Sequence, residues 1–240
     1  MVVFPNCKLN IGLYITEKRS DGYHNLETVF LPLPLHDCLE IIPTNDSFSF
    51  QSSGLSIAGN ADNNLCVKAY QLLKQDYPQL GSLVMHLHKV IPMGAGLGGG
   101  SADGAFALMA INKQFNLQIP DAQLKAYALQ LGSDCPFFVE NKPCFAIGRG
   151  EKLTPIKLSL QGYQCWVINP QIHVSTAWAF AQIQPQKAPI NLLHAIQQPI
   201  AEWKHSIANQ FQAPVCATYT AIAEIVATLY EQGALYAAMS

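Results

Sequence analysis

A glycine-rich stretch in the first half of the chain most constrains what the chain can fold into. Residues 94–100 (Gly-Ala-Gly-Leu-Gly-Gly-Gly) hold five glycines in seven positions. Residues 82–91 before them alternate between apolar and polar side chains like a strand, and residues 101–111 after them have helical spacing. Backbone N–H groups approach an anion closely where Cβ atoms are absent, and the start of a helix carries partial positive charge. The order of strand, glycine loop and helix therefore predicts a phosphate-binding loop.

Three other interpretations of these glycines are weaker. A flexible surface loop fits poorly with the length of the stretch and its place between two regular segments. Gly94, Gly96 and Gly99 also satisfy the dinucleotide pattern Gly-x-Gly-x-x-Gly, but that fold needs a strand ending in an acidic residue about 20 positions later. Residues 120–127 in that region read as the start of a helix instead. A Walker-type loop needs Lys and then Ser or Thr after its last glycine, whereas Ser101 and Ala102 follow here.

The rest of the pattern predicts an α+β protein with two domains. Strands are expected at residues 8–15, 26–33, 37–42, 47–51, 82–91, 137–147 and 163–168, and helices at 63–73, 101–111, 121–131 and 214–230. The pattern starts afresh near Pro155, so the expected domains are residues 1–155, which carry the glycine loop, and residues 156–240.

Composition narrows the class of protein. Hydrophobic residues make up 50% of the 240 residues and charged residues only 12%, which excludes a disordered chain or a polyelectrolyte. With a formal net charge of -2, the chain lacks the excess of positive charge that favours binding to nucleic acid or to an anionic membrane. The seven cysteines are scattered without a Cys-x-x-Cys pair, as is typical of reduced thiols. Because the chain shows neither a secretory leader nor an apolar run of about 20 residues, we expect a cytoplasmic protein.

Two motifs resemble one enzyme superfamily. Residues 92–101 (Pro-Met-Gly-Ala-Gly-Leu-Gly-Gly-Gly-Ser) are similar to the central ATP-binding motif of the galactokinase, homoserine kinase, mevalonate kinase and phosphomevalonate kinase superfamily. Residues 5–13 resemble its first motif, in which a lysine enters the active site from the first strands. Within this superfamily Gly22, Tyr23 and His24, followed by an apolar strand, resemble the diphosphocytidyl-methylerythritol kinases specifically.

The resemblance implies a fold and a nucleotide site. The fold would be the two-domain small-molecule kinase fold, with an N-terminal ribosomal-protein-S5-like domain and a C-terminal ferredoxin-like α/β sandwich. ATP would be the co-substrate together with Mg²⁺, and Ser101 is a candidate ligand of the ion. The implied ATP-binding residues are Pro92, Met93, Gly94, Ala95, Gly96, Leu97, Gly98, Gly99, Gly100, Ser101, Ala102, Lys89, Asn64 and Leu65.

The resemblance also implies the chemistry, which is phosphorylation of the 2-hydroxyl of 4-diphosphocytidyl-2-C-methyl-D-erythritol in non-mevalonate isoprenoid synthesis. Residues 131–138 resemble the segment that carries the catalytic aspartate of these kinases. Asp134 would accept the hydroxyl proton, while Lys8 would keep Asp134 ionised and stabilise charge on the attacking oxygen. The simpler interpretation is that Asp134 caps a turn after Gly132 and that Lys8 is one end of a solvated strand.

Recognition of a cytosine ring requires aromatic faces and a hydrogen-bonding group at the ring edge. Tyr23 and Phe180 are the candidate faces, His24 is the candidate edge group, and Asn10 and Thr176 complete the implied substrate site. The alternatives are that Tyr23 packs on the sheet after a turn and that Phe180 is a core residue. His86 and His88 alternate on one expected strand, but no third metal ligand lies at a recognisable spacing, so we assign them to the strand surface.

The end of the sequence departs from the family pattern. A third motif rich in glycine and serine is expected after the last long helix, and the sequence stops at Ser240, where that motif should open. We therefore expect a further tail of a few dozen residues. Two rival functions stay open, namely a superfamily kinase acting on mevalonate or homoserine, and a nucleotide-binding module without turnover.

Overall fold

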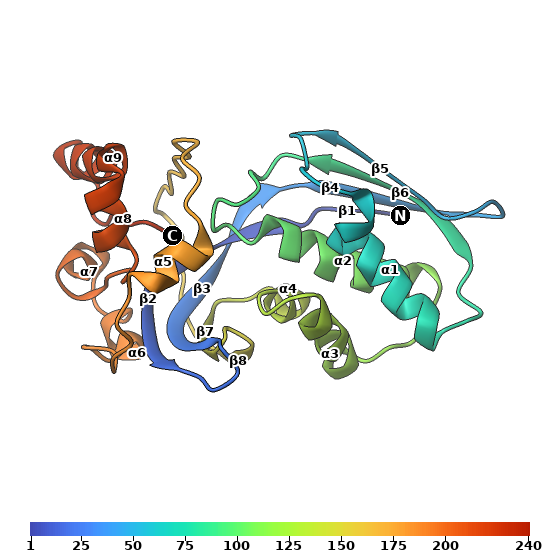
Figure 1. Ribbon diagram of the computed structural model, residues 1–240, viewed down its shortest axis with the longest axis horizontal. Helices are drawn as coiled ribbons and strands as arrows, with labels where there is room; N and C mark the ends of the chain where they lie inside the picture. The colour runs from blue at the N-terminus through green and yellow to red at the C-terminus, as the bar shows by residue number, and fades with distance from the viewer. The chain divides into compact units, whose positions relative to one another are not determined.

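The computed structural model describes residues 1–240, which form two compact units (Figure 1). The first unit contains Met1–Lys8 and Pro32–Lys142, and the second contains Leu9–Leu31 and Pro143–Ser240. The units interleave along the chain because two long strands pass from one unit to the other. The division into domains at residue 155 stays a prediction, and the compact units follow these other boundaries.

The first unit is built on a four-stranded sheet with the order β1-β4-β6-β5. Its strands are β1 (Val2–Val3), β4 (Cys38–Thr44), β5 (Ser49–Gly54) and β6 (Ser82–Lys89). β6 pairs antiparallel with β4, so that Ile41 lies opposite Met85, and parallel with β5. Alternate residues of β6 are buried, Leu83, Met85 and Leu87 among them, so one face of the sheet forms the core.

Helices cover the buried face of this sheet (Figure 1). They are the short 3₁₀ helix η1 (Ala61–Asn63) and the α-helices α1 (Leu65–Asp76), α2 (Gly99–Gln114), α3 (Asp121–Leu131) and α4 (Cys135–Glu140). The side chain of Asn64 accepts the N–H of Cys66 and thereby fixes the start of α1. α2 begins directly after the glycine loop, with Gly98 in the left-handed region.

The second unit combines a sheet of order β2-β3-β7-β8 with five short helices. Its strands are β2 (Asn6–Lys18), β3 (His24–His36), β7 (Cys144–Gly148) and β8 (Lys152–Pro155), and its helices are α5 (Thr176–Ala181), α6 (Leu192–Ala195), α7 (Ile200–Ser206), α8 (Gln212–Thr218) and α9 (Thr220–Glu231). β3 and β7 are antiparallel, with Leu26 opposite Gly148. The start of β2 and the end of β3 belong to the first unit.

Most expected elements are confirmed, and α3 has the expected bounds, but three expectations were wrong. Residues 137–147 are not one strand, because α4 precedes β7; Pro136 pre-sets a helical start, and Phe137 and Phe138 are buried from the helix. Residues 163–168 form no strand, and Trp166 is 68% exposed. An apolar run needs a partner strand to become part of a sheet.

The third correction concerns residues 214–230, which form two helices instead of one. α8 and α9 meet at a bend of 116°. Tyr219 lies between them with φ of -118° and ψ of 80°, outside the helical region. Its neighbours Thr218 and Thr220 are β-branched, and the Thr218 hydroxyl donates to the carbonyl of Pro214 one turn earlier. Both features weaken a helix at this point.

No single helix has the length and apolar character required to cross a membrane, and only α8 and α9 taken together across their bend meet that requirement.

We predict that the core of the first unit depends on Leu73. Leu73 on α1 is fully buried, whereas Leu129 on α3 is 37% exposed. Leu73→Ala should lower the free energy of unfolding by about 2–5 kcal/mol, because it leaves a cavity, and Leu129→Ala by about 1 kcal/mol or less. Urea denaturation measures both values. Equal losses in the two variants would contradict this assignment of the core.

Candidate active site

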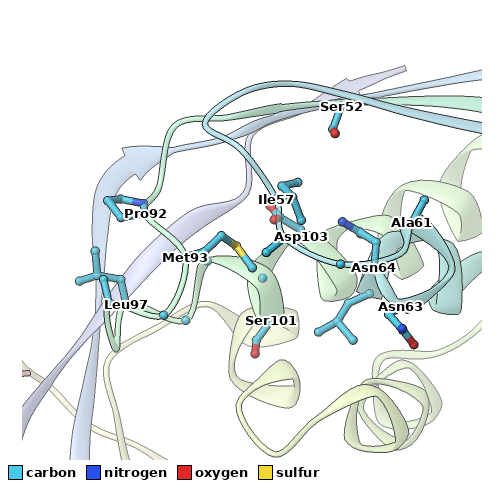
Figure 2. A pocket seen from close by; sticks show the side chains of 18 of the residues that line it. Ser52, Ile57, Ala61, Asn63, Asn64, Pro92, Met93, Leu97, Ser101 and Asp103 are labelled. Carbon is cyan, nitrogen blue, oxygen red and sulfur yellow. The ribbon is translucent and has the colours of Figure 1, made fainter. Parts of the chain in front are cut away.

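The glycine loop lines a cavity of about 450 Å³ in the first unit. Residues 92–101 all line it, together with Asn64 and Leu65 at the start of α1 and residues 57–60 before η1. Figure 2 shows Met93 on one side of the cavity and Asn64 on the other. Most of the residues expected to bind ATP are therefore brought together; Ala102 and Lys89 are the two that do not line the cavity.

The backbone of the loop requires glycine at several positions. Gly94, Gly96 and Gly98 have φ values of 70°, 74° and 68°, in the left-handed region that other residues rarely adopt. A Cβ atom on Gly98 would also lie 3.0 Å from Cζ of Phe138 and 3.1 Å from Cε of Lys8. No side chain caps the start of α2, so the N–H groups of its first turn are left for an anion.

Lys8 and Asp134 form an ion pair beside this loop. Lys8 is 4% exposed, its backbone N–H donates to the carbonyl of Leu97, and its Nζ lies 3.6 Å from Oδ2 of Asp134. Asp134 precedes α4, but its side chain makes no capping hydrogen bond and is 32% exposed. The carboxylate is therefore not used as a helix cap, which argues against the simpler interpretation of Asp134.

Two neighbours of the pair complete this part of the site. Ser101 lies in the first turn of α2 and lines the cavity. Burial raises the pKa of the Cys135 thiol, next to Asp134, to about 12. This thiol is therefore neutral near pH 7 and is not a candidate nucleophile.

Lys89 lies within a buried cluster of charges, outside the cavity lining. Its Nζ donates to Oδ2 of Asp37 and, at 2.7 Å, to Oδ2 of Asp103. Asp103 lines the cavity, and its Oδ1 is buried without a hydrogen-bond partner. Burial raises the pKa of Asp103 to about 7, with a further rise from the charge of Asp37, while Lys89 lowers it.

Asp37 and Asp103 were not predicted as functional residues. The sequence did contain a sign that Asp103 is a buried, paired charge. Only 12% of the residues are charged, and Asp103 lies between the small residues Ala102 and Gly104 near the start of a helix. A charge in such a setting is buried only when it has a partner. The partner lies 14 positions away for Asp103 and 52 for Asp37, so sequence spacing gave no hint of it.

The residues expected to bind the second substrate lie in the second unit. His24 stacks on Phe180 with ring centroids 4.9 Å apart, and Phe211 meets Phe180 edge-on. Tyr23 is 56% exposed, and the guanidinium of Arg149 lies over its ring at 4.9 Å. His24 and Phe180 are thus brought into contact, and Tyr23 presents an aromatic surface to solvent.

Asn10 and Thr176 were also expected in the substrate site. The backbone N–H of Asn10 donates to Oγ of Ser240 at 2.9 Å, and Thr28 donates to its side-chain oxygen at 3.4 Å. Thr176 is the first residue of α5 and is exposed. No interaction in the structure joins these two residues to the stacked pair.

No group of three or more His, Cys, Asp or Glu side chains is arranged to hold a metal ion. His86 and His88 both lie on β6, where their ring nitrogens are 3.0 and 2.9 Å from Oγ of Ser53. They lie on the face of the sheet opposite to the buried residues of β6.

Comparison with known proteins identifies the family. A protein from Bacteroides fragilis named 4-diphosphocytidyl-2-C-methyl-D-erythritol kinase is 52% identical over 243 residues, which cover 100% of this chain and 88% of that protein. A Cytophaga hutchinsonii protein of the same name is 43% identical, with the same two coverages. This chain belongs to the 4-diphosphocytidyl-2-C-methyl-D-erythritol kinase family. Residues 64–142 also match the family described as GHMP kinases N terminal domain.

Solved structures agree with this family and confirm the expected two-domain α+β kinase fold. A crystal structure of 4-(cytidine 5'-diphospho)-2C-methyl-D-erythritol kinase matches with a TM-score of 0.75 and 28% identity over 97% of this chain and 84% of that one. Homoserine kinase from Cytophaga hutchinsonii matches with a TM-score of 0.61 and 14% identity over 96% of this chain and 80% of that one, which shows the fold alone.

We predict that Gly98 is required for the kinase loop. Gly98→Ala should lower the free energy of unfolding by about 1–2 kcal/mol, because alanine is strained at this φ value, and should weaken ADP binding because its Cβ displaces Lys8 or Phe138. Gly233→Ala is the matched variant, because Gly233 also has a left-handed φ, 91°, but its Cβ would have no atom within 4 Å and the residue lies outside the cavity lining. It should lose stability and keep the wild-type affinity for ADP. Urea denaturation and calorimetric titration with ADP measure the two effects. An equal loss of ADP affinity in both variants would contradict the prediction.

Proposed function

We propose that this chain transfers the γ-phosphoryl group of ATP to the 2-hydroxyl of 4-diphosphocytidyl-2-C-methyl-D-erythritol, a step of non-mevalonate isoprenoid precursor synthesis. The observation that carries the proposal is the Lys8–Asp134 ion pair beside the glycine loop. It occurs in a chain that is 52% identical to a protein named 4-diphosphocytidyl-2-C-methyl-D-erythritol kinase. Neither feature alone identifies a substrate.

The proposed mechanism gives each part of the first unit one task. The N–H groups of the glycine loop and the first turn of α2 bind the phosphates of ATP. Asp134 accepts the proton as the substrate oxygen attacks the γ-phosphorus, and the bond from that phosphorus to the β,γ-bridging oxygen breaks to release ADP. Lys8, whose Nζ is 3.6 Å from Oδ2 of Asp134, pairs with the carboxylate and stabilises the charge on the attacking oxygen.

Magnesium is the proposed companion of ATP, because it neutralises phosphate charge. Mg²⁺ takes oxygen ligands and usually keeps several of its waters. Ser101 and Asp103 both line the cavity, and the Ser101 hydroxyl and the unpartnered Oδ1 of Asp103 are oxygen donors of this kind. The residues present therefore fit the ion, with Ser101 as the proposed ligand and Asp103 beside it.

Recognition of the cytidyl group is proposed for the second unit. The exposed ring of Tyr23 and the ring of Phe180 offer aromatic faces, and the ring nitrogens of His24 offer edge contacts. Asn10 and Thr176 are proposed to contact the methylerythritol diphosphate portion. Because the reaction uses small soluble substrates, we also keep the sequence-based proposal that the protein is cytoplasmic.

We predict that release of ADP requires the cytidyl substrate and Asp134. The assay offers the purified protein ATP with this substrate, then with mevalonate and with homoserine. Only the cytidyl substrate should give turnover, and Asp134→Asn should lower kcat by about 10²–10⁴-fold, because the general base is lost. Tyr23→Ala should raise the KM for the cytidyl substrate and leave the KM for ATP unchanged. Asp121→Asn, an exposed carboxylate at the start of α3, is the matched control and should match wild type.

The outcomes separate the rival functions. Turnover with mevalonate or homoserine would keep the superfamily and reject the cytosine site. ADP binding without turnover on any alcohol would favour the nucleotide-binding module. Full activity of Asp134→Asn would reject Asp134 as the base.

A further inference from the structure

A buried cluster of three charges, made by Asp37, Lys89 and Asp103, lies next to the glycine loop in the first unit. The three residues are only 1–2% exposed, and one ammonium serves two carboxylates. Burying such groups is costly unless each is paired and hydrogen-bonded. A cluster of this kind, adjacent to a nucleotide site, requires an explanation beyond packing, and Asp37 has no assigned role.

Asp37 is attached to the start of the loop. Its Oδ1 accepts the backbone N–H groups of Val90 and Ile91 at 2.6 and 2.8 Å, and these residues directly precede Pro92, the first residue lining the cavity from this side. Hydrogen bonds from backbone donors to a carboxylate are stronger than those between neutral groups. The carboxylate therefore fixes the direction in which the chain leaves β6.

Lys89 connects the same carboxylate to the other end of the loop. Its Nζ bridges Oδ2 of Asp37 and Oδ2 of Asp103, which is the fifth residue of α2. The first residue of α2, Gly99, lies so close that a Cβ atom there would be 3.0 Å from this Nζ. One carboxylate thus joins the residues before the loop to the helix after it.

We propose that Asp37 is a positioning residue for the nucleotide loop, holding both of its ends in the geometry that binds phosphate. This inference rests on the proposed function, because it assigns a task to a residue that touches neither substrate. Catalysis of phosphoryl transfer depends mainly on positioning, so a small displacement of the loop is costly.

The cluster requires a carboxylate at position 37, and a neutral side chain of the same shape is inadequate. One oxygen of Asp37 faces two N–H donors and the other faces an ammonium. In Asp37→Asn one of these positions becomes an NH₂ group, which directs hydrogens at other donors. The variant also removes a negative charge beside Lys89. The substitution therefore disturbs the loop at both ends while changing the side-chain volume very little.

The experiment compares Asp37→Asn with Asp76→Asn. Asp76 is the matched control, because it lies in the same unit and accepts a hydrogen bond from the Tyr127 hydroxyl but lines no part of the cavity. Asp37→Asn should weaken ADP binding in calorimetry and raise the KM for ATP by about tenfold or more, with kcat at saturating ATP reduced less. The KM for the cytidyl substrate should change less than about twofold. Hydrogen exchange at the N–H groups of Val90 and Ile91 should become faster.

Asp76→Asn should keep the wild-type affinity for ADP, even if its free energy of unfolding falls. Equal ADP affinity and equal KM for ATP in wild type and Asp37→Asn would overturn the proposal. If Asp37→Asn does not fold, Asp37→Glu replaces it: glutamate keeps the charge but moves the carboxylate by one methylene, and unchanged ADP binding in that variant would equally overturn it. A wild-type protein that binds no ADP would instead reject the proposed function. The hydrogen-exchange rates at Val90 and Ile91 would still test whether Asp37 holds the start of the loop.

Discussion

The buried ammonium of Lys89 joins the parts of the first unit that form the nucleotide cavity. It extends from the last residue of β6, and its two carboxylate partners come from the residue before β4 and from the first turns of α2. A sheet and a helix that pack through apolar side chains alone can slide by small amounts, whereas charged hydrogen bonds fix distance and direction. In this unit the cluster fixes the end of β6 relative to the start of α2, and thereby the two ends of the glycine loop.

Gly98 and Lys8 show how closely the loop is fitted to the catalytic pair. The side chain of Lys8 passes Gly98 so closely that a Cβ atom there would lie 3.1 Å from its Cε. The backbone of Lys8 is tied to the same loop through Leu97. The glycine requirement at this position therefore has two independent causes, one from backbone conformation and one from the lysine. The loop proposed to bind phosphate and the lysine proposed to contact the attacking oxygen are therefore built as one arrangement.

Sequence reasoning succeeded where the information was local. The strand before the loop, the helix after it and α3 all follow from periodicity and from residues at their ends. It failed where the outcome depended on distant partners. Residues 163–168 are mostly apolar, like a strand, but a strand exists only if a neighbour accepts its hydrogen bonds, and none does. The ATP-binding role of Lys89 stays a prediction; what sequence reasoning missed is that the register of β6 turns this side chain to the buried face, outside the cavity lining. The partners that hold it there are 14 and 52 residues away.

Substrate identity depends on a different kind of information from the fold. Homoserine kinase shares the fold at 14% identity, so the arrangement of sheet, loop and helices does not select the alcohol that is phosphorylated. The residues proposed for the cytosine ring lie at the start of β3 and in the six-residue helix α5, and Tyr23 is largely exposed. Exposed turns and short helices accept substitution without loss of the core, whereas Lys8, Lys89 and Asp37 do not. The positions proposed to select the substrate, Tyr23 and Phe180, are therefore separate from the buried charges that contact both ends of the glycine loop.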